Sequence, residues 1–275
     1  MRKCPAFTVV ELLVVVSIVA LLIALLLPAL AKAKGLANSV TCESNLRQLA
    51  YAYTEYTQSS AAQRAGPVFT GGPFFLSLAR EFSSNSSLPE NNVSFAIPSS
   101  ELKILICPSA PTASFSPYGG YGTAKSSWIL PMSQPKLRSI VSSYGFNGWM
   151  YNWEDSPPAP KADIVDWGFG YPQKFWNSSQ STAGAQTPLF SDDIWFTGWV
   201  GATNQPPANV EAPWPWTPSD MANLCINRHQ GGINVVFVDG HVQHVALGDL
   251  WELEWHPDFY PKKVWGGFAP PVDLP

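Results

Sequence analysis

The sequence predicts an α+β protein, in which one long N-terminal transmembrane helix packs on a loop-rich, mainly antiparallel β domain. Three observations predict this fold class. A continuous apolar segment occupies residues 7–31, whereas the rest of the chain is rich in Pro (26), Gly (20) and Trp (12). Short apolar runs bounded by turn residues, which are typical of strands, recur in the second half of the chain.

The composition excludes two classes of protein. Charged residues make up 13% of the chain, the formal net charge is −4, and no run of Lys and Arg is present, so no nucleic-acid partner is expected. The hydrophobic fraction of 46% is ample for a core, which argues against a disordered chain.

The N-terminal segment predicts a transmembrane helix. Residues 7–31 are apolar except for Glu11 and two hydroxyl side chains, and about 20 such residues span the hydrocarbon layer. Three interpretations compete. The segment is a plain membrane anchor, a secretory signal cleaved at Ala29–Ala31, or a retained helix that follows a leader at 1–6 cleaved between Ala6 and Phe7.

Glu11 discriminates among these interpretations. A carboxylate in the bilayer costs on the order of 2.5–3.5 kcal/mol when it is central, so one that persists usually has a partner. Cleavage before Phe7 creates an α-amino group about one helical turn from Glu11, on the same chain or on a neighbour. The other two interpretations supply no such counter-charge.

The run A-F-T-V-V-E followed by about 20 apolar residues resembles the prepilin-type cleavage and methylation motif of type IV pilins and pseudopilins. Pro28 falls where type IV pilins often carry a helix-kinking proline. The resemblance implies cleavage by a prepilin peptidase between Ala6 and Phe7, N-methylation of Phe7, and docking of subunits through Glu11. The sequence departs from the pattern at Ala6, where Gly is usual.

The helix is predicted to continue as an amphipathic stalk to residue 57. Apolar residues spaced 4, 3, 4 and 3 apart form one stripe: Cys42, Leu46, Leu49, Tyr53 and Tyr56. The remaining residues, 58–275, are assigned to one globular domain, so the expected shape is the lollipop of a pilin.

Within the domain, the pattern predicts several short elements and long ordered loops. The expected elements are a short helix at 73–82, a strand within 101–109, an aromatic β segment at Ser142–Met150, and a strand at about Thr187–Ser191; long loops are expected over 151–220. The many tryptophans are interpreted mainly as core packing, with stacking on sugar rings as the alternative.

A β-hairpin is predicted at 233–246. Two apolar runs flank Asp239-Gly240, a strong two-residue turn signal, and the predicted register pairs Val235 with His244 and Phe237 with Val242. His241 and His244 lie an odd number of residues apart, so they point to opposite faces of a regular strand. We therefore favour structural roles over a metal or catalytic site for the set formed by His229, Asp239, His241 and His244.

The same region carries a second resemblance. His229, nine intervening residues and Asp239-Gly240 resemble the H-x9-D-G signature of pilin-like proteins with an uncharacterised C-terminal domain. Other pieces agree in order: Cys42–Gln48, Cys107–Ser109, Ser142–Gly148 and Pro188–Asp193. The resemblance implies an exported pseudopilin-like subunit.

The cysteines leave two states open. In an oxidising compartment Cys42 and Cys107 can form a disulfide that ties the stalk to the domain, or both can be buried free thiols. The cysteine spacing matches no zinc pattern. No cofactor is expected, and calcium binding at Asp192, Asp193, Asp163 or Asp166 is only weakly indicated, because no D-x-D-x-D-G loop is present.

These features predict a non-enzymatic pilin-like or pseudopilin-like subunit of the bacterial inner membrane, with its domain in the periplasm or at the cell surface. Its expected partners are the prepilin peptidase, other pilin-like subunits and the membrane. No nucleophile–base motif indicates an enzyme. A carbohydrate- or surface-binding protein that uses the leader only for export is the first alternative, and a hydrolase with a hidden His/Asp site is the second.

Overall fold

A computed structural model of the chain describes residues 8–58, 103–113, 120–130, 140–150, 176, 184–213 and 219–262. In chain order the elements are α1 (Val9–Gln58), η1 (Lys103–Leu105), β1 (Thr112–Ala113), β2 (Ser126–Leu130), β3 (Ile140–Ser142), β4 (Tyr144–Asn147), η2 (Gly148–Met150), β5 (Pro188–Asp192), β6 (Thr197–Gly198), α4 (Met221–Leu224), β7 (Gly232–Phe237), β8 (Val242–Ala246) and η5 (Leu247–Glu252).

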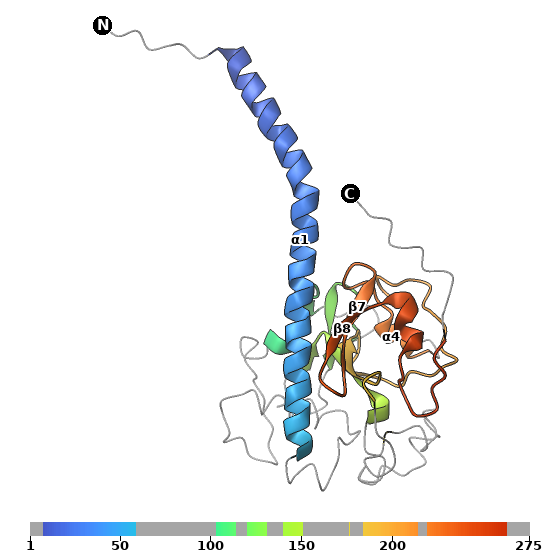
Figure 1. The fold of residues 1–275 in the computed structure, drawn as a ribbon. Coiled ribbons are helices and arrows are strands. Elements are labelled where there is room, and N and C mark those ends of the chain that lie inside the picture. The colour runs from blue at the N-terminus through green and yellow to red at the C-terminus, as the bar shows by residue number, and fades with distance from the viewer. Residues whose placement is uncertain are drawn as a thin grey trace.

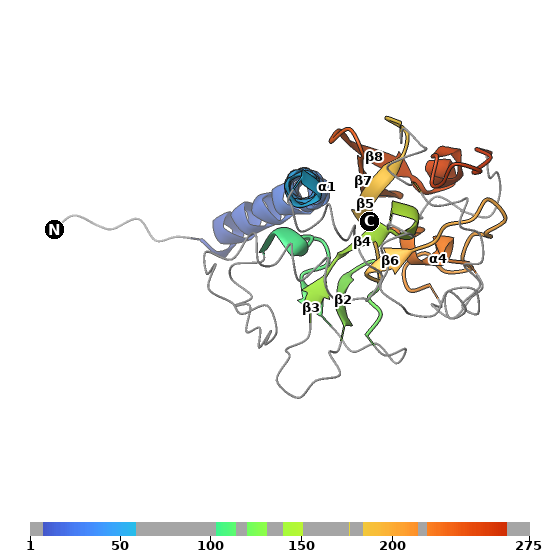
Figure 2. The ribbon, with the colours of Figure 1, turned by 90° about the horizontal axis from the view of Figure 1, so that it is seen from below.

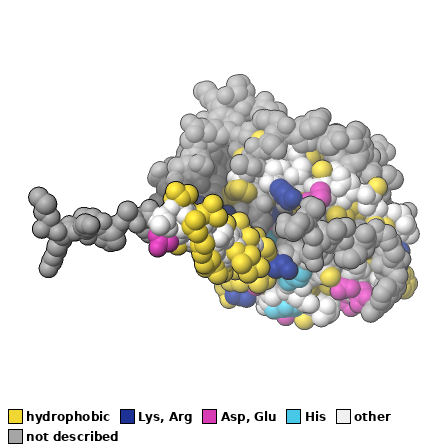
Figure 3. Space-filling view, turned by 90° about the horizontal axis from the view of Figure 1, so that it is seen from above, with side chains coloured by type: hydrophobic (Ala, Val, Ile, Leu, Met, Phe, Trp, Pro, Cys, Tyr) yellow, Lys and Arg dark blue, Asp and Glu magenta, His cyan; other side chains and the backbone are white. Residues whose placement is uncertain are grey.

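The N-terminal helix α1 is continuous over 50 residues, which confirms the long helix that the sequence predicts. It is long and apolar enough to cross a membrane. The large apolar side chains from Val9 to Leu30 are exposed, and Figure 3 shows them covering the helix on the side in view. The helix curves in its N-terminal half, which contains Pro28 (Figure 1).

The C-terminal half of α1 packs along the β domain (Figures 1 and 2). Cys42, Leu46 and Leu49 are buried, and Tyr53 packs against the same core. The predicted stripe is therefore confirmed up to Tyr53, while the side chain of Tyr56 lies outside the described residues.

A five-stranded sheet, with the order β6-β4-β5-β7-β8, forms the centre of the domain, and a three-stranded sheet has the order β1-β2-β3. Most neighbouring strands are antiparallel, whereas β4–β6 and β1–β2 are parallel. The helix α1 contacts β5, β7 and β8, and the short α4 contacts β6. The α+β class is confirmed.

The C-terminal hairpin is present, but its predicted register is wrong by one residue. In the structure Val235 pairs with Gln243 and Asn234 pairs with His244. A two-residue type I′ turn requires positive φ at both central residues, whereas at this turn only Gly240 has positive φ (87°). The longer turn adds a residue and shifts the pairing.

The two hairpin strands differ from each other in burial. All six residues of β7 are buried, because β7 pairs on both sides and lies against α1. Strand β8 is at the edge of the sheet, and it buries Val245, whereas Val242 is only half-buried.

The strand predicted within 101–109 is wrong. Lys103–Leu105 form a short 3-10 helix, and the chain then turns, with the Ala110 N–H bonded to the Cys107 carbonyl. The Leu105 carbonyl accepts bonds from the Ser143 N–H and the Ser142 hydroxyl instead of a strand ladder. Burial of Leu105 therefore does not require an extended chain here.

The other predicted elements are partly confirmed. The segment Ser142–Met150 contains β4 but ends in the 3-10 helix η2, and the strand expected at about 187–191 is β5. The predicted helix at 73–82 and most of the loops over 151–220 lie outside the described residues.

The fully buried tryptophans confirm the packing role. Trp128, Trp251 and Trp255 are at most 1% exposed. Each indole N–H donates to a backbone carbonyl, at 3.0, 3.0 and 2.8 Å respectively. Each ring therefore fills the core without leaving its one polar atom unpaired.

Candidate functional site: a buried cysteine, aspartate and histidine cluster

Four side chains that are far apart in the sequence meet where α1 joins the β domain. We call them the Cys–Asp–His cluster: Cys42, Cys107, Asp192 and His229. Their sulfur, oxygen and nitrogen atoms all lie within 4.8 Å of one another. None of the four residues is more than 4% exposed.

Each member comes from a different element. Cys42 lies on the buried stripe of α1, and Asp192 ends β5. Cys107 follows η1, where its N–H bonds to the Ser143 hydroxyl at 3.0 Å. His229 precedes β7 in a tight turn, in which its N–H bonds to the Gly232 carbonyl.

Asp192 is the centre of the cluster. One carboxylate oxygen, Oδ1, lies 3.3 Å from the Cys42 sulfur, and the other, Oδ2, lies 3.2 Å from Nε2 of His229. The Asn234 N–H also donates to Oδ2, at 2.8 Å. Both oxygens are therefore held by neighbours on α1, β7 and the preceding loop.

Arg228 supplies a fixed positive charge beside Asp192. Its Nη1 lies 3.3 Å from Oδ1 of Asp192, and both side chains are fully buried. The guanidinium also donates to the backbone carbonyls of Ala124, Thr123, Ser143 and Asp193. Such complete pairing is what a buried guanidinium requires.

Hydrogen-bond donors also surround the two sulfurs. The Tyr144 hydroxyl donates to the Cys42 sulfur at 3.1 Å, and the Ser109 N–H donates to the Cys107 sulfur at 3.4 Å. Asn45, one turn beyond Cys42, donates to the Tyr144 hydroxyl and so fixes its position.

The protonation states of the cluster are coupled. Burial acts to raise the pKa of the Cys107 thiol, but hydrogen bonds from Cys42 and His229 and the charge of Arg228 lower it to about 6. Burial also disfavours a charged His229, yet the neighbouring Asp192 carboxylate raises the pKa of that imidazole to about 10. Burial raises the pKa of Cys42 well above its usual value.

The geometry differs from a Cys–His–Asp catalytic triad. In a triad the nucleophile and the carboxylate contact opposite nitrogens of the imidazole. Here the Cys107 sulfur, at 3.4 Å, and Asp192 both contact Nε2 of His229. The other nitrogen, Nδ1, has no partner among the described residues. The Cys107 sulfur, Oδ2 of Asp192 and Nε2 of His229, all atoms of kinds that bind metals, therefore lie next to one another.

Cys42 and Cys107, for which the sequence leaves a disulfide and two free thiols as alternatives, are brought together here. Cys42 and Cys107 are free thiols in the structure, with sulfurs within 4.8 Å of each other. Their oxidised pairing stays a prediction. Cys225, the third described cysteine, is also buried and lies outside the cluster.

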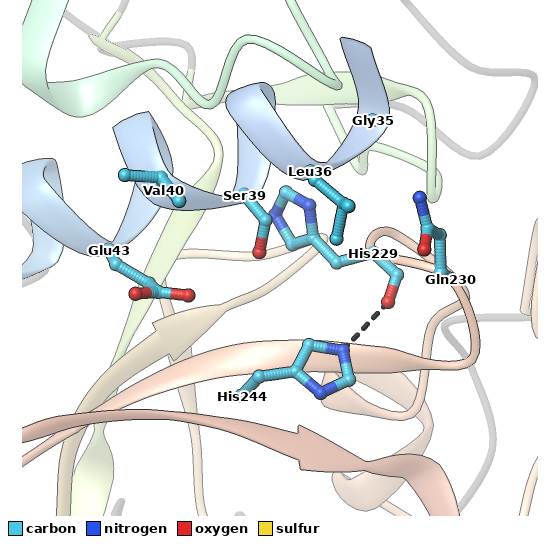
Figure 4. A pocket seen from close by; sticks show the side chains of 8 residues that line it. All are labelled: Gly35, Leu36, Ser39, Val40, Glu43, His229, Gln230 and His244. Atoms are coloured by element: carbon cyan, nitrogen blue, oxygen red, sulfur yellow. Dashed lines mark hydrogen bonds between the residues drawn. The ribbon is translucent and has the colours of Figure 1, made fainter. Parts of the chain in front are cut away.

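The residues of the H-x9-D-G pattern lie at two different places. His229 belongs to the cluster, whereas Asp239 and Gly240 form the exposed turn of the hairpin. Asp239 pairs there with His241 at 2.6 Å, and His241 stacks on Phe237. Nε2 of His244 lies 2.7 Å from the His229 carbonyl oxygen (Figure 4).

At the other end of the molecule, Glu11 has a local partner that the sequence reasoning missed. Thr8 precedes the first helical residue, and its N–H and hydroxyl donate to the Glu11 carboxylate at 2.9 and 2.8 Å. The Glu11 N–H donates back to the Thr8 hydroxyl, which completes a capping box. Ala6 and Phe7 lie outside the described residues.

The described acidic residues considered for calcium, Asp192 and Asp193, do not face a group of oxygen ligands. Asp192 faces sulfur and nitrogen, and Asp163 and Asp166 lie outside the described residues. Asp193 accepts the Trp195 N–H at 2.8 Å, and its other oxygen is buried without a partner in the described part of the chain. Burial raises the pKa of Asp193 well above its usual value.

Asp220 provides a prediction on pH dependence. Burial raises its pKa from 3.8 to about 6, so the carboxylate costs stability when it ionises in the folded state. The stability that protonated Asp220 contributes is fully present below pH 3.8 and is lost as the pH rises through about 6. We expect Asp220→Asn to raise the free energy of unfolding at pH 7.5 by up to about 2–3 kcal/mol relative to wild type.

The same comparison at pH 4 is expected to show a much smaller difference, because Asp220 is then protonated in the folded state and only partly ionised in the unfolded state. Asparagine retains an oxygen that can accept the Trp199 N–H, which now bonds to Asp220 at 2.9 Å. Urea unfolding of the detergent-solubilised chain at both pH values measures the effect. An equal change at pH 4 and pH 7.5 would contradict the assignment.

Some members of the site were missed from the sequence. Apart from the family segments that contain Asp192 and Tyr144, the sequence indicates Asp192 only as an oxygen donor for calcium, and no motif points to Arg228. The adjacent Arg228-His229 before Gly231-Gly232 was an available signal, because a charged pair beside a tight turn and a buried strand needs partners.

Comparison with known proteins finds no matching family model, no matching curated protein and no matching solved structure.

Proposed function

We propose that this chain is a pilin-like or pseudopilin-like subunit, anchored in the bacterial inner membrane by the first half of α1. The observation that carries the proposal is the two-part character of α1. The helix presents apolar side chains to its surroundings from Val9 to Leu30, and it buries one stripe on the β domain from Cys42 onward. A helix that is apolar all round is stable in lipid, whereas a one-sided stripe packs on a protein core.

Glu11 fits a role in assembly. It is the one acidic residue between Val9 and Leu30, and it is exposed on an otherwise apolar surface. The Thr8 hydrogen bonds hold it within the subunit but bring no positive charge to it. In the proposed mature protein, the α-amino group of Phe7 on the same or a neighbouring subunit supplies that cation.

The proposed processing and assembly follow from this arrangement. A prepilin peptidase removes residues 1–6 and methylates Phe7, and the helices then associate in the membrane into a filament or a type II secretion-like apparatus. The β domain lies in the periplasm or at the cell surface.

Processing is tested first. Mass spectrometry of the N-terminal peptide of the membrane-extracted protein is expected to show N-methyl-Phe7 as the first residue. A mature protein that begins at Lys32 would contradict the proposal, because the helix would then have been removed as a signal peptide.

Assembly is tested with Glu11→Ala. In cells with the native assembly system, we expect the yield of cross-linked multimers to fall at least about tenfold. A charge pair worth more than about 1.4 kcal/mol changes an association constant by that factor. Glu55→Ala is the matched control, since Glu55 is exposed near the other end of the same helix. Equal multimer yields for the two variants would count against assembly through Glu11.

A further inference from the structure

We propose that the Cys–Asp–His cluster binds one divalent transition-metal ion of the zinc class, which fastens α1 to the β domain. The proposal is independent of the pilin-like assignment, because it concerns residues beyond the apolar half of the helix.

The spacing of the four ligand-type atoms fits tetrahedral coordination. With metal–sulfur bonds of about 2.3 Å and metal–nitrogen or metal–oxygen bonds of about 2.0–2.2 Å, neighbouring ligand atoms lie roughly 3.4–3.8 Å apart. Three separations are close to this range: 3.3 Å from the Cys42 sulfur to Oδ1 of Asp192, 3.4 Å from the Cys107 sulfur to Nε2 of His229, and 3.2 Å from that nitrogen to Oδ2 of Asp192. Each residue offers one ligand atom within 4.8 Å of the others, so an ion would draw the more distant atoms closer together.

The donor set selects the class of metal. Two sulfurs, one imidazole nitrogen and one carboxylate oxygen suit zinc and its chemical neighbours. Calcium and magnesium take oxygen ligands almost exclusively, so they do not suit this cluster. The two cysteines are free thiols, and Nε2 of His229 faces the Cys107 sulfur, so coordination requires only that these groups release their protons.

The charges balance when the ion is present. Two thiolates and the Asp192 carboxylate carry three negative charges, and a divalent ion together with Arg228 carries three positive charges. Arg228 is fully buried and lies 3.3 Å from Asp192, so its charge belongs to the site. A buried cluster that is neutral overall avoids the large cost of burying an uncompensated charge.

Neighbouring groups already hold the ligands in place. The Tyr144 hydroxyl and the Ser109 N–H donate to the two sulfurs, and the Asn234 N–H donates to Asp192. Hydrogen bonds of this kind orient ligands and stabilise thiolates in protein metal sites.

A surface groove borders one member of the cluster, His229 (Figure 4). It lies between α1 and the hairpin, and His229 lines it together with Ser39, Glu43 and His244. The carboxylate of Glu43 faces the same groove, and it would attract a cation toward His229. The groove is therefore the side from which an ion would approach His229.

Metal binding would connect parts of the chain that are far apart in sequence. The ion would join Cys42 of the helix to Asp192 of β5 and to the two loops that carry Cys107 and His229. The orientation of the membrane helix relative to the domain would then depend on the metal.

The first experiment measures metal in the intact protein. The full chain is purified in detergent without reducing agent, and its metal content is determined by mass spectrometry. We expect about one zinc ion per chain. After chelation and reloading with Co²⁺, we expect the near-ultraviolet thiolate-to-cobalt band and the visible absorption of tetrahedral cobalt.

The second experiment assigns the ligands. His229→Ala and Cys107→Ala are expected to lose the bound metal and the thiolate-to-cobalt band. His244→Ala and Cys225→Ala are the matched controls, because these residues are a nearby histidine and a buried cysteine outside the cluster. Both controls are expected to retain about one ion per chain.

Either of two results on the wild-type protein would overturn the proposal, even if a variant fails to fold. The first is a Cys42–Cys107 disulfide found by peptide mapping in the metal-free protein as isolated. The second is a cobalt-loaded protein that lacks the thiolate-to-cobalt band.

Discussion

Replacing Arg228 with alanine is expected to lower the free energy of unfolding by at least about 3–5 kcal/mol. The guanidinium is fully buried, and it pairs with Asp192 and with four backbone carbonyls. Truncation leaves the Asp192 carboxylate without its fixed cation and removes one donor from each carbonyl. The carbonyls of Ser143 and Thr123 keep the N–H groups of Asp193 and Ser126 as donors, whereas those of Ala124 and Asp193 lose the donor that Arg228 supplied. Each unpaired buried carbonyl adds about 1–3 kcal/mol unless water replaces the lost donor.

The measurement is urea unfolding of the detergent-solubilised chain, followed by tryptophan fluorescence of the β domain. Lys125→Ala is the matched control. Lys125 also has an acidic partner, Glu211 at 3.5 Å, but its side chain is 82% exposed. We expect the control to change stability by less than about 1 kcal/mol. Similar losses in the two variants would show that the buried network contributes little.

Replacing Leu46 with alanine is expected to cost about 2–5 kcal/mol. Leu46 is fully buried in the stripe of α1 that packs on the β domain, between Cys42 and Leu49. The shorter side chain leaves a cavity between helix and domain, since the surrounding core relaxes only in part. The loss should therefore appear as weaker docking of the helix as well as lower stability.

Two measurements follow the Leu46 variant. Urea unfolding gives the change in free energy, and limited proteolysis reports release of the helix from the domain. Tyr51→Ala is the control on the same helix, because Tyr51 is 64% exposed, and a change within about 0.5 kcal/mol is expected. A fully stable Leu46 variant with unchanged proteolysis would contradict the proposed docking.

Local sequence patterns predicted the helix well. Residues 7–31 are apolar except for Glu11 and two hydroxyl side chains, and the spacing of Cys42, Leu46 and Leu49 repeats at the helical period. Both patterns act within a single helix, so neighbouring residues determine the outcome, and α1 forms as predicted. Strand β5 and the hairpin were also predicted, because short apolar runs next to turn residues are local signals.

Details that depend on turn conformation and on distant hydrogen-bond partners were predicted less well. The hairpin register shifted by one residue because the turn places only Gly240, and not Asp239, at positive φ. The strand expected within 101–109 became a 3-10 helix, because its carbonyl at Leu105 bonds to Ser142 and Ser143 rather than to a neighbouring strand. A sequence pattern does not reveal which distant backbone groups will supply these bonds.

Glu11 illustrates both what the sequence predicts and what the structure adds. The sequence showed that a carboxylate in an apolar helix needs a partner, and cleavage before Phe7 was the partner considered. The structure adds a capping box with Thr8, which satisfies hydrogen bonds but brings no positive charge. The requirement for a cation from a processed N-terminus therefore stays a prediction.

By itself, the sequence determined the long N-terminal helix, its apolar and amphipathic halves, and the approximate places of two strands and the hairpin. Only the tertiary structure decided the buried site. Cys42 and Asp192 are 150 positions apart, and Cys107 and His229 are 122 apart, so no local pattern joins them. The packing of α1 on β5 and β7 brings their polar atoms together, because the apolar stripe and the sheet must bury one another.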